Sequence, residues 1–125
     1  MSNSELIMVH VIIAASTLLV GGISKLMKPE KRNKFVGYRT KWSEKSQATW
    51  DFANEYSGNM MLWVATVSVT IEIASALLLE ALTSVIVSCA ALTIGLTVAI
   101  VLTERKLRQK FNEDGSPKTL DADLF

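Results

Sequence analysis

Three long stretches of the chain are apolar and almost free of charge, and they limit the folds open to it. They lie at about residues 6–27, 59–79 and 81–103. Each is close to the ~20 residues that a helix needs to cross the hydrocarbon core of a bilayer. Inside lipid the backbone must satisfy its own hydrogen bonds, so these stretches are expected to be helices. A soluble three-helix bundle is the rival fold, but its helices would each show a polar face, and these stretches show none.

The sequence therefore predicts an all-α integral membrane fold with three transmembrane helices. Composition agrees, because half of the 125 residues are hydrophobic and only 20% are charged, unlike a typical soluble domain. We expect a single membrane domain over residues 1–111 and a flexible cytoplasmic tail over 112–125. The first stretch does not look like a cleavable signal peptide, since nothing basic precedes it.

The basic residues indicate how the chain crosses the membrane. Lys and Arg gather in residues 25–45 and 105–110, and none lies between the second and third spans. Loops rich in Lys and Arg stay in the cytoplasm. This predicts a multi-pass protein of the cell (cytoplasmic) membrane, with its N-terminus outside and its C-terminus in the cytoplasm. Both clusters would face anionic lipid headgroups, and we expect no nucleic-acid partner.

The first two spans are joined by a long cytoplasmic loop over residues 28–58. Within it, residues 46–57 are predicted to form a short amphipathic helix at the membrane interface, capped by Ser43 or Ser46. A direct continuation into the second span is the alternative, because Gly58 alone does not end a helix.

Polar side chains inside the spans are candidates for function. Glu72 lies within the second span, where a carboxylate is costly unless it is protonated, paired or hydrated. At about 1.5 Å per residue, Glu72 lies roughly 10 Å below the outer surface, His10 roughly 6 Å and Ser88 roughly 9 Å. The three are therefore predicted to meet in the outer half of the bundle, where a Glu72–His10 contact would be sensitive to pH. The alternatives are His10 at the wet outer interface and Glu72 as a neutral carboxyl bonded to a serine or a carbonyl.

Nothing in the sequence predicts an enzyme. The chain has one His and one Cys, both in apolar spans, and no nucleophile–base pair, metal-ligand spacing or phosphate-binding loop. We expect no cofactor and no metal ion.

The loop carries the most distinctive residues of the chain, in the segment NKFVGYRTKWSEKSQATWDFANEYSG at 33–58. It combines cations, hydrogen-bonding side chains and aromatic rings, and Gly37 is the one position in its first part that easily takes a positive φ. The candidate residues for binding a ligand or partner are Asn33, Gly37, Tyr38, Arg39, Thr40, Ser43, Trp50 and Asn54.

The pattern N-x-x-x-G-Y-R-T-x-x-S, followed by W-x-x-A-N-x-x-S-G at the head of an apolar helix, resembles the signature of the SdpI family. The match extends over roughly residues 6–103 and is strongest in the loop. The family is named for bacterial membrane proteins that protect a producing cell from its own secreted antimicrobial peptide. Some members have more spans, which implies that a three-span chain forms a homo-oligomer or has another job.

The resemblance implies an immunity protein that binds the peptide toxin, a lipid or a membrane partner. The alternatives are a small proton-coupled transporter that uses Glu72 and His10, and an accessory subunit of a larger membrane complex. Within the loop, the Arg39 guanidinium is expected to bind a lipid phosphate or to pair with Asp51 or Glu55. The other interpretation is purely structural, with the loop folded as a cap over the bundle.

Overall fold

Three helices make up most of the protein in the computed structural model, which describes residues 1–118. They are α1 (Asn3–Leu26), α2 (Gln47–Leu78) and α3 (Ala81–Lys110). Each is long and apolar enough to cross a membrane. Over the described residues the only β-type pairing is an isolated bridge between Phe111 and Pro117. The prediction of an all-α protein with three membrane-spanning helices is confirmed, and the chain is a multi-pass membrane protein.

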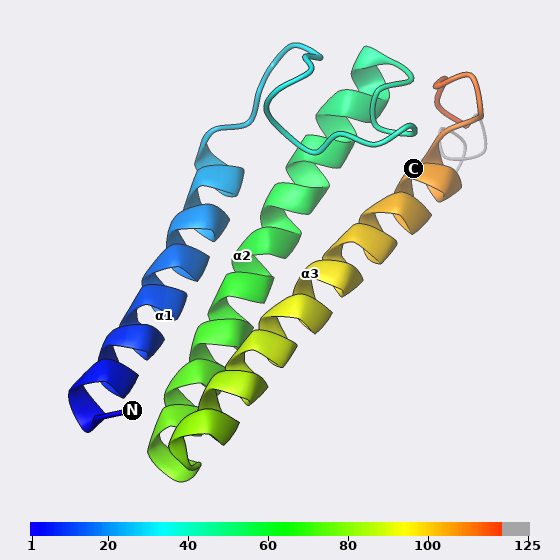
Figure 1. Cartoon of the computed structure of the whole chain (residues 1–125). Coiled ribbons are helices and arrows are strands. Elements are labelled where there is room, and N and C mark those ends of the chain that lie inside the picture. The colour runs from blue at the N-terminus through cyan, green and yellow to red at the C-terminus, as the bar shows by residue number, and fades with distance from the viewer. Residues whose placement is uncertain (119–125) are drawn as a thin grey trace.

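The helices run side by side, with α2 in the middle (Figure 1). It packs against both α1 and α3, whereas α1 and α3 barely touch. The N-terminus and the tight α2–α3 turn at residues 79–80 lie at one end, here called the hairpin end. The long α1–α2 connection and the segment after α3 lie at the opposite end, here called the polar end.

Side chains fix where α1 and α2 begin. Ser2 caps α1 in a capping box with Glu5, and Ser46 caps α2 in a similar box with Thr49. Such caps satisfy backbone N–H groups that have no partner within the first turn of a helix. Of the two caps considered for α2, the structure uses Ser46.

The short amphipathic helix predicted over residues 46–57 is wrong as a separate element. Those residues form the first turns of α2, which runs unbroken from Gln47 to Leu78. Gly58 is helical, and its missing side chain serves helix packing. A Cβ atom there would lie 2.9 Å from the carbonyl oxygen of Ser24 on α1. The glycine therefore marks a close contact between two helices, and the helix does not end there.

The interior of the bundle is built from small and polar residues. Within the spans the buried side chains include Thr17, Ala65, Ser68 and Ala99. The large aliphatic side chains point outward, and many of them are more than half exposed: Ile7, Leu19, Leu77, Leu82 and Ile94 are examples. This arrangement suits lipid, where helices associate through close packing of small residues and through hydrogen bonds.

At the polar end, residues 112–118 fold back against the α1–α2 connection. The Ser46 hydroxyl donates a hydrogen bond of 2.7 Å to the carbonyl of Gly115, and Gly115 itself is buried with a φ of +86°. The first part of the predicted tail is therefore hydrogen-bonded to the loop. The rest of that tail, residues 119–125, lies outside the described part of the chain.

The adjacent pair Gly21 and Gly22 gives a matched test of the α1–α2 packing. A Cβ atom at Gly21 would lie 2.7 Å from the Cβ of Ala65 and 3.2 Å from the carbonyl oxygen of Met61, whereas one at Gly22 would meet nothing within 4 Å. Gly21→Ala is expected to lower the free energy of unfolding by about 1–3 kcal/mol through overpacking. Gly22→Ala should be neutral or stabilising by up to about 1 kcal/mol. Unfolding in mixed micelles, followed by circular dichroism, measures both, and equal effects would contradict the packing described.

Candidate functional site

The loop over residues 28–46, here called the cap, folds over the polar end and is tied to α3 by one carboxylate. The Tyr38 hydroxyl donates to Oε1 of Glu104 at 2.8 Å. The Thr40 hydroxyl donates to the same oxygen at 2.6 Å. Two neighbouring motif residues thus share one acceptor on α3, and hydrogen bonds to a charged oxygen are stronger than neutral ones.

Ser43 holds the turn that follows. Its side chain is fully buried. Its oxygen accepts a 2.8 Å hydrogen bond from the backbone N–H of Thr40, and its hydroxyl lies 3.0 Å from the carbonyl oxygen of Tyr38. A serine that bonds the nearby backbone in this way stabilises a turn in place of a helix or strand. Ser43 therefore acts inside the cap.

Trp50 and Asn54, on the first turns of α2, hold the other side of the cap. The indole N–H of Trp50 donates to the carbonyl of Pro29 at 2.9 Å. The Asn54 side-chain oxygen accepts from the backbone N–H of Tyr38 at 2.8 Å. Gly37 passes between them with a φ of +105°, and a Cβ atom there would lie 2.6 Å from Oδ1 of Asn54. Only glycine fits this position, both for its backbone conformation and for the space available.

Asn33 and Arg39 lie toward the outside of the cap. The side-chain oxygen of Asn33 accepts from the backbone N–H groups of Phe35 and Val36 at 2.9 and 2.7 Å, which is a common turn arrangement for asparagine. Arg39 is exposed. Its Nη1 donates to the backbone carbonyl of Lys34. The remaining N–H groups of the guanidinium have no hydrogen bond to any of residues 1–118.

The pairing considered between Arg39 and Asp51 or Glu55 is not formed. Glu55 pairs instead with two lysines at the end of α1, Lys25 in its last turn at 3.3 Å and Lys28 just after it. Within the part of the chain that the structure describes, no carboxylate lies within ion-pair distance of Arg39. Lys25 and Lys28 therefore join the end of α1 to α2, whereas Arg39 faces outward.

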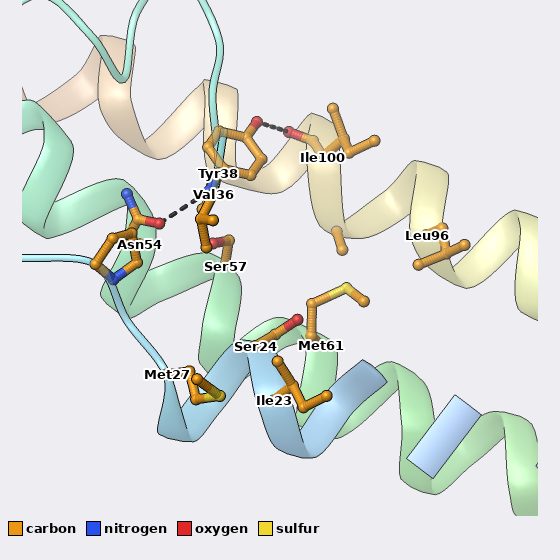
Figure 2. A pocket seen from close by; sticks show the side chains of 13 residues that line it. Ile23, Ser24, Met27, Val36, Tyr38, Asn54, Ser57, Met61, Leu96 and Ile100 are labelled. Carbon is orange, nitrogen blue, oxygen red and sulfur yellow. Dashed lines mark hydrogen bonds between the residues drawn. The ribbon is translucent and has the colours of Figure 1, made fainter. Parts of the chain in front are cut away.

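A cavity of about 310 Å³ lies beneath the cap, where α1, α2 and α3 meet it (Figure 2). Most of its wall is apolar, and three of the candidate binding residues contribute to it: Gly37, Tyr38 and Asn54. Figure 2 shows Tyr38 reaching across to α3, where its hydroxyl also lies 3.4 Å from the carbonyl oxygen of Ile100. The remaining lining residues are Ile23, Ser24, Met27, Pro29, Val36, Ser57, Met61, Leu96, Ala99 and Ile100.

A second polar cluster lies inside the bundle, in the half nearer the hairpin end. Nδ1 of His10 is 2.6 Å from Oε1 of Glu72, and Nε2 is 2.9 Å from the hydroxyl oxygen of Ser84. All three side chains are buried. The structure thus brings His10 and Glu72 together as their estimated depths suggest, and it does not place His10 at a wet surface.

Ser88 belongs to the same cluster but does not contact His10. Its hydroxyl oxygen lies 2.9 Å from that of Ser75 on α2 and 2.9 Å from the backbone carbonyl oxygen of Ser84. Ser75 in turn donates to the backbone carbonyl of Glu72. In residues 1–118, no three side chains of His, Cys, Asp or Glu come together as a metal site would require.

Two residues of these sites were missed by the sequence interpretation. Glu104 was not singled out, although it is the one acidic residue next to the basic cluster after the third span. Ser84 lies one helical turn before Ser88, and it is Ser84 that bonds His10. The sequence shows that both side chains can form hydrogen bonds. Which residue each one bonds depends on how the helices are rotated about their axes, which the sequence does not show.

Two of the comparisons with known proteins found matches. The model of the SdpI/YfhL protein family matches residues 30–103, which include most of the cap, all of α2 and most of α3. A protein of Bacillus subtilis (strain 168), named "Uncharacterized protein YfhL", is 28% identical over 111 residues, and the match covers 86% of this chain and 94% of that protein. No solved structure matches the chain at a significant level.

The bond between Tyr38 and Glu104 predicts a stability that depends on pH. Burial first, and then the hydrogen bond and negative charge of Glu104, raise the pKa of Tyr38 above its ordinary value. The unfolded chain releases this proton at about pH 10, while the folded chain keeps it. The stabilisation is therefore complete below about pH 10 and is lost as the pH rises further.

Tyr38→Phe removes this proton, so the loss of unfolding free energy between about pH 9 and 11 should become smaller than in the wild type. Unfolding in micelles at several pH values measures the slope. Tyr56→Phe is the matched control, since the Tyr56 ring stacks on Phe52. An unchanged slope in Tyr38→Phe would contradict the role given to the Glu104 bond.

Proposed function

Because the chain belongs to the SdpI/YfhL family, we propose that it protects a bacterial cell against a secreted antimicrobial peptide. The family match is the observation that carries this proposal. The structure adds support, since the residues of the loop signature are not scattered. They gather at the cap and at the start of α2, and Gly37, Tyr38, Asn54 and Ser57 among them line the cavity beneath the cap.

The orientation follows from the distribution of charge. Lys and Arg lie at the polar end, in residues 25–45 and 105–110, and the turn at the hairpin end has none. By the positive-inside rule the polar end faces the cytoplasm and the hairpin end faces outward. A secreted peptide then arrives at the hairpin end, on the side of the membrane opposite the cap. The cap therefore acts on a lipid or a membrane partner at the inner surface, and any contact with the peptide is made by the outer ends of the helices.

Most of the motif residues hold the cap in place, and one of them, Arg39, is left to bind a ligand. Tyr38, Thr40 and Ser43 use their polar groups to hold the cap on α3 and to fix its turn, and Trp50 and Asn54 bond it to α2. These residues form the scaffold. A substitution at one of them would act on the fold of the cap, and on ligand binding only through that fold.

Arg39 is the residue that this scaffold presents. Its side chain is exposed, and its one hydrogen bond within residues 1–118 goes to the carbonyl of Lys34. A guanidinium has five N–H donors in a planar fork that matches a phosphate or a carboxylate. We assign Arg39 to binding an anionic group at the inner membrane surface, either a lipid phosphate or a carboxylate of a membrane partner.

The test is the survival of a sensitive bacterial strain exposed to secreted antimicrobial peptides of producing relatives. The strain expresses wild type, Arg39→Ala, Arg39→Lys or Lys41→Ala at matched membrane levels. Wild type should protect the cells, and Arg39→Ala should lose most of the protection. Arg39→Lys keeps the charge but not the fork, so its failure would indicate bidentate recognition.

Lys41→Ala is the matched control, because Lys41 is an exposed cation two residues away and should keep near-full protection. Equal loss in Lys41→Ala and Arg39→Ala would replace specific binding by general attraction to anionic lipid. Absence of protection by well-expressed wild type would overturn the immunity proposal itself.

The orientation has its own test in intact cells. In a Cys89→Ser background, single cysteines are placed by Ser4→Cys near the N-terminus and by Lys118→Cys after α3. A membrane-impermeant maleimide should label the Ser4→Cys protein in intact cells and the Lys118→Cys protein only after lysis. The reverse pattern would contradict the orientation, and it would put the cap on the side from which the peptide arrives.

A further inference from the structure

His10 is the side chain that connects all three helices near the hairpin end. From α1, its Nδ1 meets Glu72 on α2 and its Nε2 meets Ser84 on α3. The helices α1 and α3 otherwise barely touch. We propose that His10, Glu72 and Ser84 form a proton-binding site, and that the bound proton holds α1 against the α2–α3 hairpin. This inference does not depend on the immunity proposal.

Hydrogen-bond counting fixes the proton on Nε2. The Ser84 hydroxyl lies 2.8 Å from the backbone carbonyl oxygen of Ala81 and donates to it. A hydroxyl has a single hydrogen, so while that hydrogen is bonded to the Ala81 carbonyl the Ser84 oxygen accepts from the imidazole. Nε2 of His10 must then carry a hydrogen and donate it across the 2.9 Å contact.

The contact with Glu72 requires one more proton. At 2.6 Å, Nδ1 and Oε1 cannot face each other with two lone pairs, so a hydrogen lies between them. On the nitrogen it gives an imidazolium beside a carboxylate, and on the oxygen an imidazole beside a carboxylic acid. The number of protons is the same in both forms, and so is the net charge of the pair, which is zero.

Every other proton count leaves a net charge within the hydrocarbon. Loss of the shared proton leaves a carboxylate facing a ring nitrogen, and gain of a second one leaves an imidazolium beside a neutral acid. Side chains of the small residues that surround the pair offer no opposite charge. Isolated charges at this depth are expensive, and a buried ionic contact that loses one partner is strongly destabilised. Only the state with one shared proton gives His10, Glu72 and Ser84 their hydrogen bonds and leaves the pair without a net charge.

No other titratable group of the described spans takes over this role. On α1 there is Glu5, which is exposed and bonds the backbone N–H of Ser2. Near the start of α3 there are Glu80 and Cys89, both exposed, and in residues 59–78 of α2 Glu72 is the sole charged residue. Departure of the shared proton at alkaline pH, or addition of a second one at acidic pH, therefore weakens the hold of the hairpin on α1.

The proton itself is tested by NMR of the full chain in lipid bilayers. The chain has a single histidine, so ¹⁵N-histidine labelling reports His10 alone. At neutral pH we expect a protonated Nε2 and one strongly deshielded proton resonance correlated with Nδ1. Glu72→Gln should remove that resonance, while Glu80→Gln, which changes an exposed carboxylate at the same end, should keep it.

An unprotonated Nε2, or a deshielded resonance that survives in Glu72→Gln, would overturn the site. Circular dichroism of each variant confirms that the helices are intact. Glu72→Gln is expected to fold, because a glutamine amide has the shape of the protonated carboxyl and can still donate to Nδ1.

The hold on α1 is tested by the distance between α1 and α3. Spin labels are placed by Val11→Cys and Ile86→Cys, both at exposed positions next to the site, in a Cys89→Ser background. At the alkaline pH values where the deshielded resonance disappears, pulsed EPR should show the distance distribution broadening in the parent. With Glu72→Gln added it should stay unchanged, since the amide does not titrate. The same pH response in both proteins would refute the proposal that the shared proton holds α1 against the α2–α3 hairpin.

Discussion

Polar groups buried in hydrocarbon have no water to bond with, and the interior of this protein is arranged around that constraint. Each buried side-chain nitrogen or oxygen in residues 1–118 has a hydrogen-bond partner. The large aliphatic side chains, which would form the core of a soluble protein, face outward to lipid. Glycine and alanine then let the backbones approach, as where Gly95 on α3 faces Val64 on α2. The helices therefore associate by close contact and by hydrogen bonds.

The sequence predicts depth well because the rise of a helix is nearly constant. Counting residues from the span ends puts His10 and Glu72 at similar depths, and the structure has them in contact. The rotation of each helix about its axis has no comparable rule. Ser84 and Ser88 are one turn apart on α3, and only the contacts of the folded bundle decide that Ser84 reaches the imidazole. Fold class follows from composition and span length, whereas the partners of a site depend on packing.

The contact partners of the cap residues could not be predicted from the sequence either. Its motif residues are recognisable in the sequence, but Glu104, which holds Tyr38 and Thr40, lies more than sixty residues further along the chain. Local pattern cannot supply a partner at that separation. The wrong expectation of a separate interfacial helix has a similar origin, since nothing local distinguishes a glycine that ends a helix from one that admits a neighbour. At Gly58 the neighbour is the backbone of α1 at Ser24.

The two polar sites hold α1 at opposite ends and by different means. At the polar end Trp50 bonds the carbonyl of Pro29, and Glu55 pairs with Lys25 and Lys28, so several independent contacts would have to break together. Toward the hairpin end the polar hold on α1 rests on His10 and one shared proton. A change in protonation would then free the half of α1 near the hairpin end and leave the half near the polar end in place. Such a helix is free to tilt about its fixed end, and a tilt would change the end of the bundle opposite the cap while the contacts of the cap stay in place.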